Sequence, residues 1–374
     1  MVRYEMSRLR LPFRLHLKLP FGIDWSLYLV PLILSIIGIV IIFSVTYATR
    51  PTLVISQIIY LVLGAGVAIF LTFLDYRLLR GVSFFLYLIV LALLIVVLLF
   101  SSRTFGAHRW INLGVFQLQP SEIGKLVILL FLARIFAETE EFRLREILLI
   151  LTIVALPIIL ILLQPDFGTA MVIFLELIVL LFFSNVKKIV LLVVMAAILI
   201  SAPIGWHFLK DYQKERIYTF INPSQDPYGS GYNVAQAKIT VGSGGLWGQG
   251  IGKGTQIQLK FLPVAHTDFI FASTAEAIGF VGSSLLIILL IFLCFRIITI
   301  SRLSKDLFGF YFAIGWGLVL LFQILINVGM NLGIMPVTGI PLPFVSSGGS
   351  QMITNLAAIG ILQSIYLRHR KITF

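Results

Sequence analysis

Residues 27–47 read LYLVPLILSIIGIVIIFSVTY, a stretch without a single charged side chain. A helix crosses the hydrocarbon core of a bilayer with about 20 predominantly apolar residues, so this stretch predicts a membrane-spanning helix. Comparable stretches recur along the whole chain. We expect spans at residues 27–47, 53–74, 82–100, 122–137, 146–163, 168–184, 188–208, 269–296, 308–329 and 348–367. The sequence therefore predicts an all-α integral membrane protein with about ten transmembrane helices, organised as one membrane domain over residues 1–374.

Composition points to the same class. Of the 374 residues, 59% are hydrophobic and only 12% are charged, and the mean hydropathy is +1.04. Soluble domains carry about 25% charged residues. The single cysteine, Cys294, excludes an internal disulfide. The formal net charge of +12 does not indicate nucleic-acid binding, because basic residues beside membrane helices are explained by topology and by anionic membrane lipid.

The distribution of Lys and Arg predicts the orientation. Alternate short loops are basic, and they lie on the same side as the basic N-terminal segment and the C-terminal tail. Their basic residues are Arg77, Arg80, Arg143, Arg145, Lys187, Lys188, Arg302 and Lys305. The short loops on the other side hold only Arg50, Arg103 and Arg109. Since basic loops stay in the cytoplasm, we expect both termini there, with residues 1–26 cytoplasmic and residues 209–268 forming a long extracytoplasmic loop between helices seven and eight.

Polar residues suited to chemistry gather on the side with few charges. Glu122 and Lys125 are spaced i, i+3 at the start of a helix entered through Pro120, so they share one face. A charged pair in a membrane is a functional-site hypothesis by default, although a salt bridge that locks the helix is the alternative. Asp166, just before the sixth span, is typical of a helix cap.

A second group lies around the eighth span. Asp268 opens this span, and Glu276 lies eight residues later, about two turns deeper on the same helical face. A carboxylate at a hydrophobic boundary can have a raised pKa and act as a general base, whereas helix capping is the alternative for Asp268. His266 is weak evidence by itself. Ser350 begins the last helix, where free N–H groups favour anions.

These segments together resemble the SEDS family (shape, elongation, division and sporulation) over nearly the whole chain, and its rod-shape members more than its division members. The resemblance is carried by RW at 109–110, QPSE at 119–122, NP at 222–223, DP at 226–227, GYN at 231–233, HTDFIFA at 266–272, PLP at 341–343 and GGS at 348–350.

The resemblance implies a peptidoglycan glycosyltransferase of the bacterial cytoplasmic (inner) membrane that polymerises lipid II for cell-wall elongation and rod-shape maintenance. It also implies a ten-helix fold and a class B penicillin-binding protein as partner. Asp268 matches the family's essential acidic residue.

The residue chemistry fits this implication. Asp268 can serve as the general base toward the acceptor 4-hydroxyl, with lipid II and the nascent glycan strand as the substrates. Arg109 and Lys125 can neutralise pyrophosphate, alone or with a divalent cation such as Mg²⁺ or Mn²⁺. The remaining substrate-binding candidates are Glu122, His266, Glu276 and Ser350. Two rivals stay open: a lipid II flippase, which needs ionisable groups near the midplane and access from both sides, and a non-catalytic scaffold, which needs no base.

Overall fold

The computed structural model describes residues 22–47, 50–100, 109–112, 117–194, 211–222, 229–259 and 261–369, together with residues 196, 200 and 207. Its helices are α1 (Ser26–Thr46), α2 (Thr52–Phe73), α3 (Tyr76–Phe100), α4 (Pro120–Glu138), α5 (Leu144–Leu163), α6 (Phe167–Phe183), α8 (Asp211–Ile221), α9 (Ser230–Ser243), α10 (Thr255–Gln258), α11 (Ile270–Leu303), α12 (Leu307–Asn331) and α13 (Gly349–Leu367). Two short strands, β1 (Ile111–Asn112) and β2 (Gln117–Leu118), pair in antiparallel fashion.

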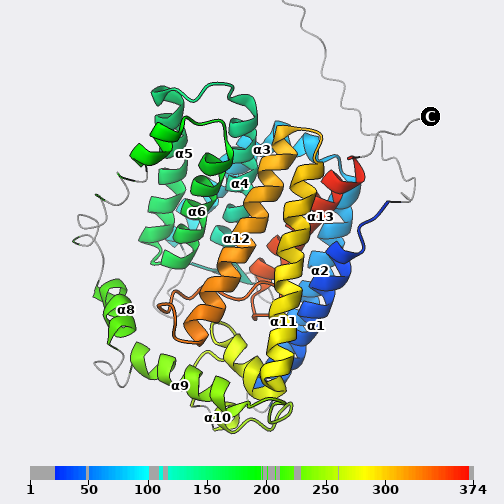
Figure 1. The fold of residues 1–374 in the computed structure, drawn as a ribbon, viewed down its shortest axis with the longest axis vertical. Coiled ribbons are helices and arrows are strands. Elements are labelled where there is room, and N and C mark those ends of the chain that lie inside the picture. Colours follow the sequence, from blue (N-terminus) through cyan, green and yellow to red (C-terminus); the bar gives the residue numbers. More distant parts are fainter. Residues whose placement is uncertain are drawn as a thin grey trace, which may run out of the picture.

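The long helices form one bundle (Figure 1). In the part of the chain that the structure describes, α1, α2, α3, α5, α11 and α12 are long and apolar enough to cross a membrane, and α6 is a shorter apolar helix. These helices confirm the predicted helical membrane protein. The count of ten stays a prediction, because most of the expected span at 188–208 lies outside the described residues.

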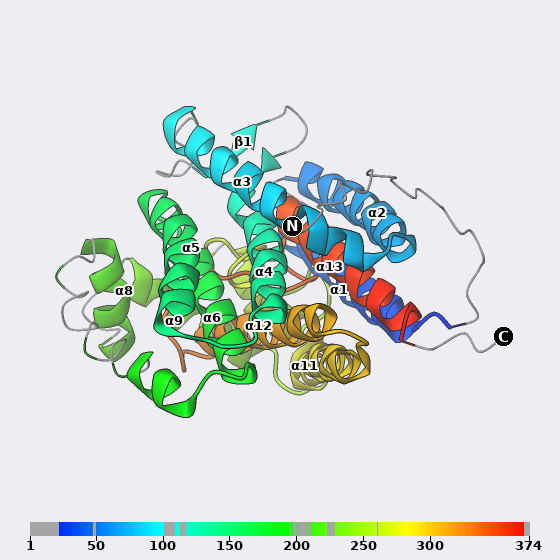
Figure 2. The same ribbon diagram turned by 90° about the horizontal axis from the view of Figure 1, so that it is seen from above.

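Helices α4 and α13 coincide with expected spans but carry more polar residues than the helices around them. Both lie inside the bundle: α4 packs against α3, α6 and α12, and α13 packs most extensively against α2. Figure 2 shows α13 in red between α1 and α2. Protein rather than lipid surrounds these two helices, which explains how they tolerate polar side chains in a membrane protein.

Helices α8, α9 and α10 lie at one end of the bundle, here called the loop end (Figure 1). They occupy the described part of the segment predicted as the long extracytoplasmic loop. The starts of α4, α6, α11 and α13 and the end of α12 face the same end. The motif residues, which are far apart in the sequence, are therefore brought to one end of the bundle.

A break at Gly279 divides α11 into two helical stretches. Gly279 has φ 68° and ψ −170°, a conformation essentially restricted to glycine. The loop at residues 245–250 fills the break with four backbone hydrogen bonds of 2.8–3.2 Å. They run from the N–H groups of Gln249 and Gly250 to the carbonyls of Glu276 and Ala277, and from the N–H groups of Phe280 and Val281 to the carbonyls of Gly245 and Leu246. The broken helix thus keeps its backbone polar groups paired.

Candidate active site

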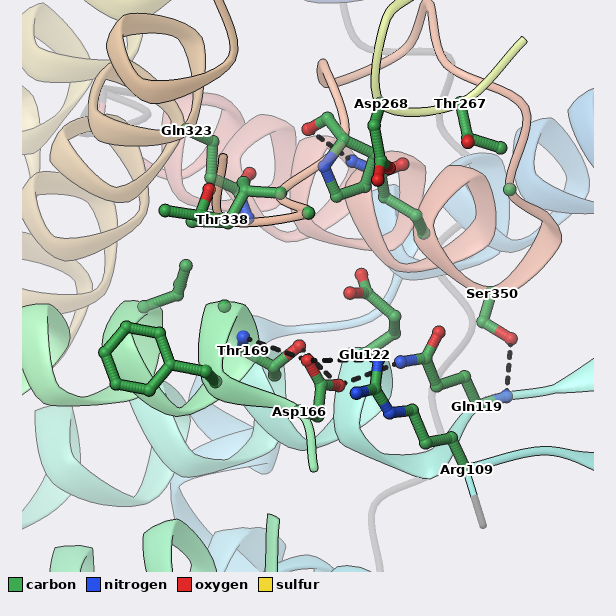
Figure 3. Close-up of a pocket in the computed structure, with 18 of the residues that line it drawn as sticks. Arg109, Gln119, Glu122, Asp166, Thr169, Thr267, Asp268, Gln323, Thr338 and Ser350 are labelled. Atoms are coloured by element: carbon green, nitrogen blue, oxygen red, sulfur yellow. Dashed lines mark hydrogen bonds and ion pairs between the residues drawn. The ribbon is translucent and has the colours of Figure 1, made fainter. Parts of the chain in front are cut away.

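A cavity of about 260 Å³ lies at the loop end, where the starts of α4, α6 and α13 meet the turn before α11 (Figure 3). Its charged lining residues are Arg109, Glu122, Lys125, Asp166, Arg216 and Asp268. Three are basic and three are acidic, so the cavity concentrates ionisable groups at the boundary of an apolar bundle. Such a concave site with convergent polar groups is the first place to expect substrate.

Five of the seven site residues predicted from sequence line this cavity: Arg109, Glu122, Lys125, Asp268 and Ser350. His266 and Glu276 are not among its lining residues. The structure therefore brings together residues that lie up to about 240 positions apart in the chain, on four separate segments. The roles of these residues in binding or catalysis stay predictions.

Glu122 and Lys125 form a buried ion pair on the first turns of α4. Lys125 Nζ lies 2.8 Å from Glu122 Oε2, and the side chains are only 3% and 7% exposed. Glu122 also lies in the first turn of the helix, where the helix dipole stabilises a negative charge. The pair lies at the helix start and lines the cavity, and its role in binding substrate or in locking the helix stays a prediction.

Asp268 lies in the turn before α11, with its carboxylate directed into the cavity (Figure 3). The interpretation of Asp268 as a helix cap is wrong, because α11 begins at Ile270 with no side-chain cap hydrogen bond. Two amides fix the turn instead. Asn327 and Asn331 each donate a hydrogen bond of 3.0 Å from Nδ2 to the backbone carbonyl of Asp268. The carboxylate itself is thus left to face the cavity.

The surroundings of Asp268 raise the pKa of its carboxyl above the ordinary value for aspartate. Burial is the main cause, and the nearby negative charge of Asp166 acts in the same direction. The positive charges of Arg216 and Arg109 and a hydrogen bond from Thr267 oppose the shift without cancelling it. A carboxylate with a raised pKa accepts a proton more readily, which is the property a general base needs.

Asp166 is a cavity residue that the sequence analysis placed only as a cap. It does cap α6, since its carboxylate accepts hydrogen bonds from Thr169 N at 3.3 Å and Thr169 Oγ1 at 2.9 Å. It also accepts from Gln119 Nε2 at 3.0 Å and Ser121 Oγ at 3.2 Å, and Arg109 Nη1 lies 4.0 Å away. These contacts tie the starts of α4 and α6 together and hold Arg109 at the cavity (Figure 3).

Arg216 is a second residue that sequence reasoning missed. It comes from α8, in the long loop, and its Nη1 donates a 3.0 Å hydrogen bond to the carbonyl of Thr338. Arg216 exerts the largest favourable electrostatic effect on the Asp268 carboxylate. No local motif marks this arginine; the only sequence signal is a basic side chain in a long loop with otherwise turn-like composition.

Ser350 holds the start of α13 against the short β-pair. Its hydroxyl accepts a hydrogen bond of 2.8 Å from Gln119 N and donates one of 3.2 Å to the Gln117 carbonyl. The N-terminus of α13, with Gly348 and Gln351, also lines the cavity. The anion-binding feature expected from the sequence is therefore the helix start, while the Ser350 side chain is already engaged with protein.

Glu276 is fully buried, but its carboxylate faces the loop between α9 and α10. It accepts hydrogen bonds from Gln256 N at 2.8 Å and Ile257 N at 3.3 Å, the first turn of α10. His266 is partly buried, and burial lowers the pKa of its imidazole. Within the described residues both side chains thus lie at the edge of the site, outside the cavity lining.

The described residues contain no group of three or more His, Cys, Asp or Glu side chains that could hold a metal ion. Asp166 already accepts from several protein donors and Glu122 pairs with Lys125, which leaves Asp268 as the third carboxylate of the lining. Mg²⁺ is often held by one or two carboxylates together with substrate phosphates. That mode fits this lining, so a divalent cation stays a prediction.

Three comparisons with known proteins agree on the family. The model of the FtsW, RodA and SpoVE cell cycle protein family matches residues 23–371. The peptidoglycan glycosyltransferase MrdB of Escherichia coli is 42% identical over 299 residues, which cover 79% of this chain and 80% of the relative. The stage V sporulation protein E of Bacillus subtilis is 34% identical over 355 residues, covering 91% and 96%.

The solved structures give the same answer. A chain from a peptidoglycan synthase complex that coordinates polymerization and crosslinking superposes with a TM-score of 0.81 at 32% identity, covering 93% of this chain and 99% of that one. The rod shape determining protein RodA of Thermus thermophilus superposes with a TM-score of 0.70 at 30% identity, covering 92% and 97%. The chain therefore belongs to the FtsW, RodA and SpoVE family, the SEDS family that its motifs resemble, and is a multi-pass membrane peptidoglycan glycosyltransferase of cell-wall synthesis.

Proposed function

We propose that this glycosyltransferase polymerises lipid II into glycan strands with Asp268 as the general base. The observation that carries the proposal is the carboxylate of Asp268, which faces a cavity lined by Arg109, Lys125 and Arg216. A base beside three cations suits a reaction in which a hydroxyl loses a proton while a diphosphate departs.

Each bond formed in this reaction is matched by a bond broken. The carboxylate of Asp268 takes the proton of the acceptor 4-hydroxyl, and the oxygen of that hydroxyl bonds to the anomeric carbon of the donor. The bond from that carbon to the phosphate oxygen breaks, and undecaprenyl pyrophosphate leaves with the electron pair. Attack opposite the leaving group converts an α-linked donor into a β-1,4 product.

The basic residues would bind the diphosphate. Arg109 and Arg216 present planar guanidinium groups, which match phosphate oxygens well, and the start of α13 adds free N–H groups. Gln323 and Thr338 line the cavity, and their buried Oε1 and Oγ1 atoms have no hydrogen-bond partner among the described residues, so a side-chain rotation would let them meet sugar hydroxyls. A divalent cation, if present, would add positive charge beside Asp268.

A flippase is the second candidate, and contacts at the end of the bundle opposite the loop end argue against it. Arg296 pairs with Asp24 to join α11 to the start of α1, and Asp306 accepts a 2.6 Å hydrogen bond from Tyr76 Oη between α12 and α3. These contacts join helices at the end opposite the cavity, whereas a flippase needs access from both sides. A scaffold would need no carboxylate directed into a cavity.

The finer biological assignments belong to the same proposal. We expect elongation and rod-shape maintenance, in line with the rod-shape relatives, and a class B penicillin-binding protein as partner, since one structural neighbour belongs to a synthase complex that also crosslinks. We expect the cytoplasmic (inner) membrane with both termini inside. In a Cys294→Ala background, Ser230→Cys should react with an impermeant thiol reagent in intact spheroplasts; reaction only after lysis would reverse the orientation.

The decisive experiment is lipid II polymerisation by the purified protein, with and without its class B partner, resolved on gels. Moenomycin, which inhibits the unrelated glycosyltransferase domains, controls for contamination. Asp268→Asn should lose at least about a hundredfold in rate, the usual worth of a general base, while Asp75→Asn, an exposed aspartate at the other end of the bundle, should retain full activity. Polymerisation by a well-folded Asp268→Asn variant at the normal rate would refute the assignment.

A further inference from the structure

The loop between α9 and α10 exposes three large apolar side chains at the loop end, of which Ile251 is 50% exposed and the other two are exposed further. Leu246 is 65% exposed and Trp247 is 78% exposed. A loop that normally faces water has no reason to present them. The question is which surroundings these side chains occupy when the protein lies in its membrane.

Several backbone polar groups of this loop are hydrogen-bonded to protein. The four hydrogen bonds at the α11 break pair the N–H groups of Gln249 and Gly250 and the carbonyls of Gly245 and Leu246. Gly248 N–H is paired as well, with the Gly244 carbonyl at 2.8 Å. Irregular backbone enters a membrane only where protein satisfies its polar groups, and here α11 satisfies four of those in the loop, which suits the partly hydrated headgroup region rather than the hydrocarbon core.

The lipid-facing side of α11 fixes the depth of the loop. Its exposed apolar residues begin at the break and continue along the helix: Phe280 at 66%, Leu285 at 56%, Ile288 at 61% and Phe295 at 68%. From Phe280 to Ile300 the helix rises about 30 Å, the thickness of the hydrocarbon core, and Arg302 follows at the far boundary. A hydrocarbon core that ends before Arg302 therefore begins near Phe280, the first exposed residue of α11 from the loop end, with Arg296 near its far side neutralised by Asp24.

Leu246 and Trp247 lie at this boundary. The N–H groups of Phe280 and Val281 bond directly to the carbonyls of Gly245 and Leu246, at 2.9 and 3.2 Å. The exposed apolar side chains of the loop thus adjoin the lipid-facing surface of α11. Tryptophan is enriched at this depth in membrane proteins, because its ring is apolar and its N–H group is polar.

We propose that Leu246 and Trp247 anchor the α9–α10 loop in the headgroup region of the bilayer, as a membrane-interface contact that continues the lipid-facing surface of α11. The occupant of this surface is phospholipid. Lys253, exposed in the same loop, is placed to meet lipid phosphate. The anchored loop also pairs with Glu276 and Ala277 on the helical stretch that begins just after Asp268, so the membrane contact fixes the height of the cavity relative to the lipid headgroups.

Fluorescence quenching tests this proposal. A variant that keeps Trp247 as its only tryptophan, with Phe at positions 25, 110, 206 and 316, is placed in nanodiscs. Lipids brominated near the headgroup should quench its emission at least about twofold, as for a ring at the interface. Unquenched emission that aqueous acrylamide quenches freely would overturn the proposal. Shielding that appears only when the class B partner is added would overturn it in favour of a protein contact.

Spin labelling gives an independent measurement if the four tryptophan changes disturb folding. In a Cys294→Ala background, Trp247→Cys is compared in nanodiscs with Ile288→Cys on the lipid-facing side of α11 and Glu140→Cys in the exposed α4–α5 loop. The label at 247 should be more accessible to oxygen, relative to a water-soluble nickel reagent, than the label at 140, and less so than the label at 288. Accessibility at 247 equal to that at 140 would contradict insertion.

Discussion

The buried ion pair of α4 offers a way to separate stability from substrate binding. Glu122→Gln removes the carboxylate 2.8 Å from Lys125 Nζ and leaves an ammonium group whose side chain is 3% exposed. Lys125→Met leaves the opposite charge uncompensated. The double variant Glu122→Gln, Lys125→Met leaves neither charge behind.

The expected magnitudes follow from burial. Removing one partner of a buried pair costs about 3–5 kcal/mol, because the other charge stays in a poorly solvated site. Glu122→Gln should fall at the lower end, since Glu176, fully buried on α6 and within electrostatic reach of Lys125, can give up a proton and pair with it once Glu122 is gone. Lys125→Met should fall at the upper end. The double variant should regain most of the loss, because replacing both partners is often neutral.

The assay measures thermal unfolding and lipid II polymerisation on the same three preparations. If Lys125 binds the donor diphosphate, the double variant unfolds near the wild-type temperature and remains inactive. A stable double variant that polymerises lipid II at the wild-type rate would refute the binding role and leave the pair as a lock for the helix. Lys125→Arg, which keeps the charge and changes the geometry, should retain partial activity.

Three further outcomes are expected. Because the pKa of Asp268 is raised, wild-type polymerisation should fall as the pH drops through that pKa. Above that pKa the ionised carboxylate lowers the stability of the folded protein, so Asp268→Asn should unfold no earlier than wild type at neutral pH. This difference in stability should disappear below the ordinary aspartate pKa. Gly279→Ala should lower stability by about 2–4 kcal/mol in thermal unfolding, since the added Cβ would overlap the backbone of the 245–250 loop at a positive φ, whereas Gly66→Ala, in open space on α2, should be neutral or stabilising. Arg216→Ala should raise the KM for lipid II at least about tenfold, the effect of losing one charge-assisted hydrogen bond, while Lys214→Ala on the same helix should not; equal effects would assign Arg216 a general electrostatic role.

Hydropathy and helix signals predicted the helical membrane fold well, because lipid demands apolar length. The expected span at 122–137 corresponds to α4, Pro120–Glu138, and the Glu122–Lys125 spacing was enough to predict their pair. Asp268 was predicted to be a site residue from its place at a hydrophobic boundary, and it lines the cavity. Each of these signals is local in the sequence.

The remainder depends on contacts between distant segments. Arg216 reaches the cavity only because α8 packs near the Thr338 carbonyl, and Asp166 gains its cavity position through Gln119 and Ser121 on another helix. Glu276 lies on α11, but the prediction that it shares a face with Asp268 is wrong, because α10 returns to its carboxylate and no periodicity reveals that contact. The break at Gly279 could not be predicted from the sequence either, because a single glycine in an apolar run rarely interrupts a membrane helix.

The position of α13 has a consequence for biogenesis. Its buried face carries Gln351, Thr354, Asn355, Gln363 and Ser364, which makes the helix a poor substrate for insertion by itself. Its main neighbour is α2, where Gly64 and Ala68 allow close approach, although nearly 300 residues separate the two helices. The ribosome therefore delivers α13 after the other described helices, and until then Thr72 on α2 lacks the Gly360 carbonyl to which it donates in the folded protein. A nascent chain truncated before residue 349 should accordingly be recognised by membrane proteases as incomplete, even with every earlier helix inserted.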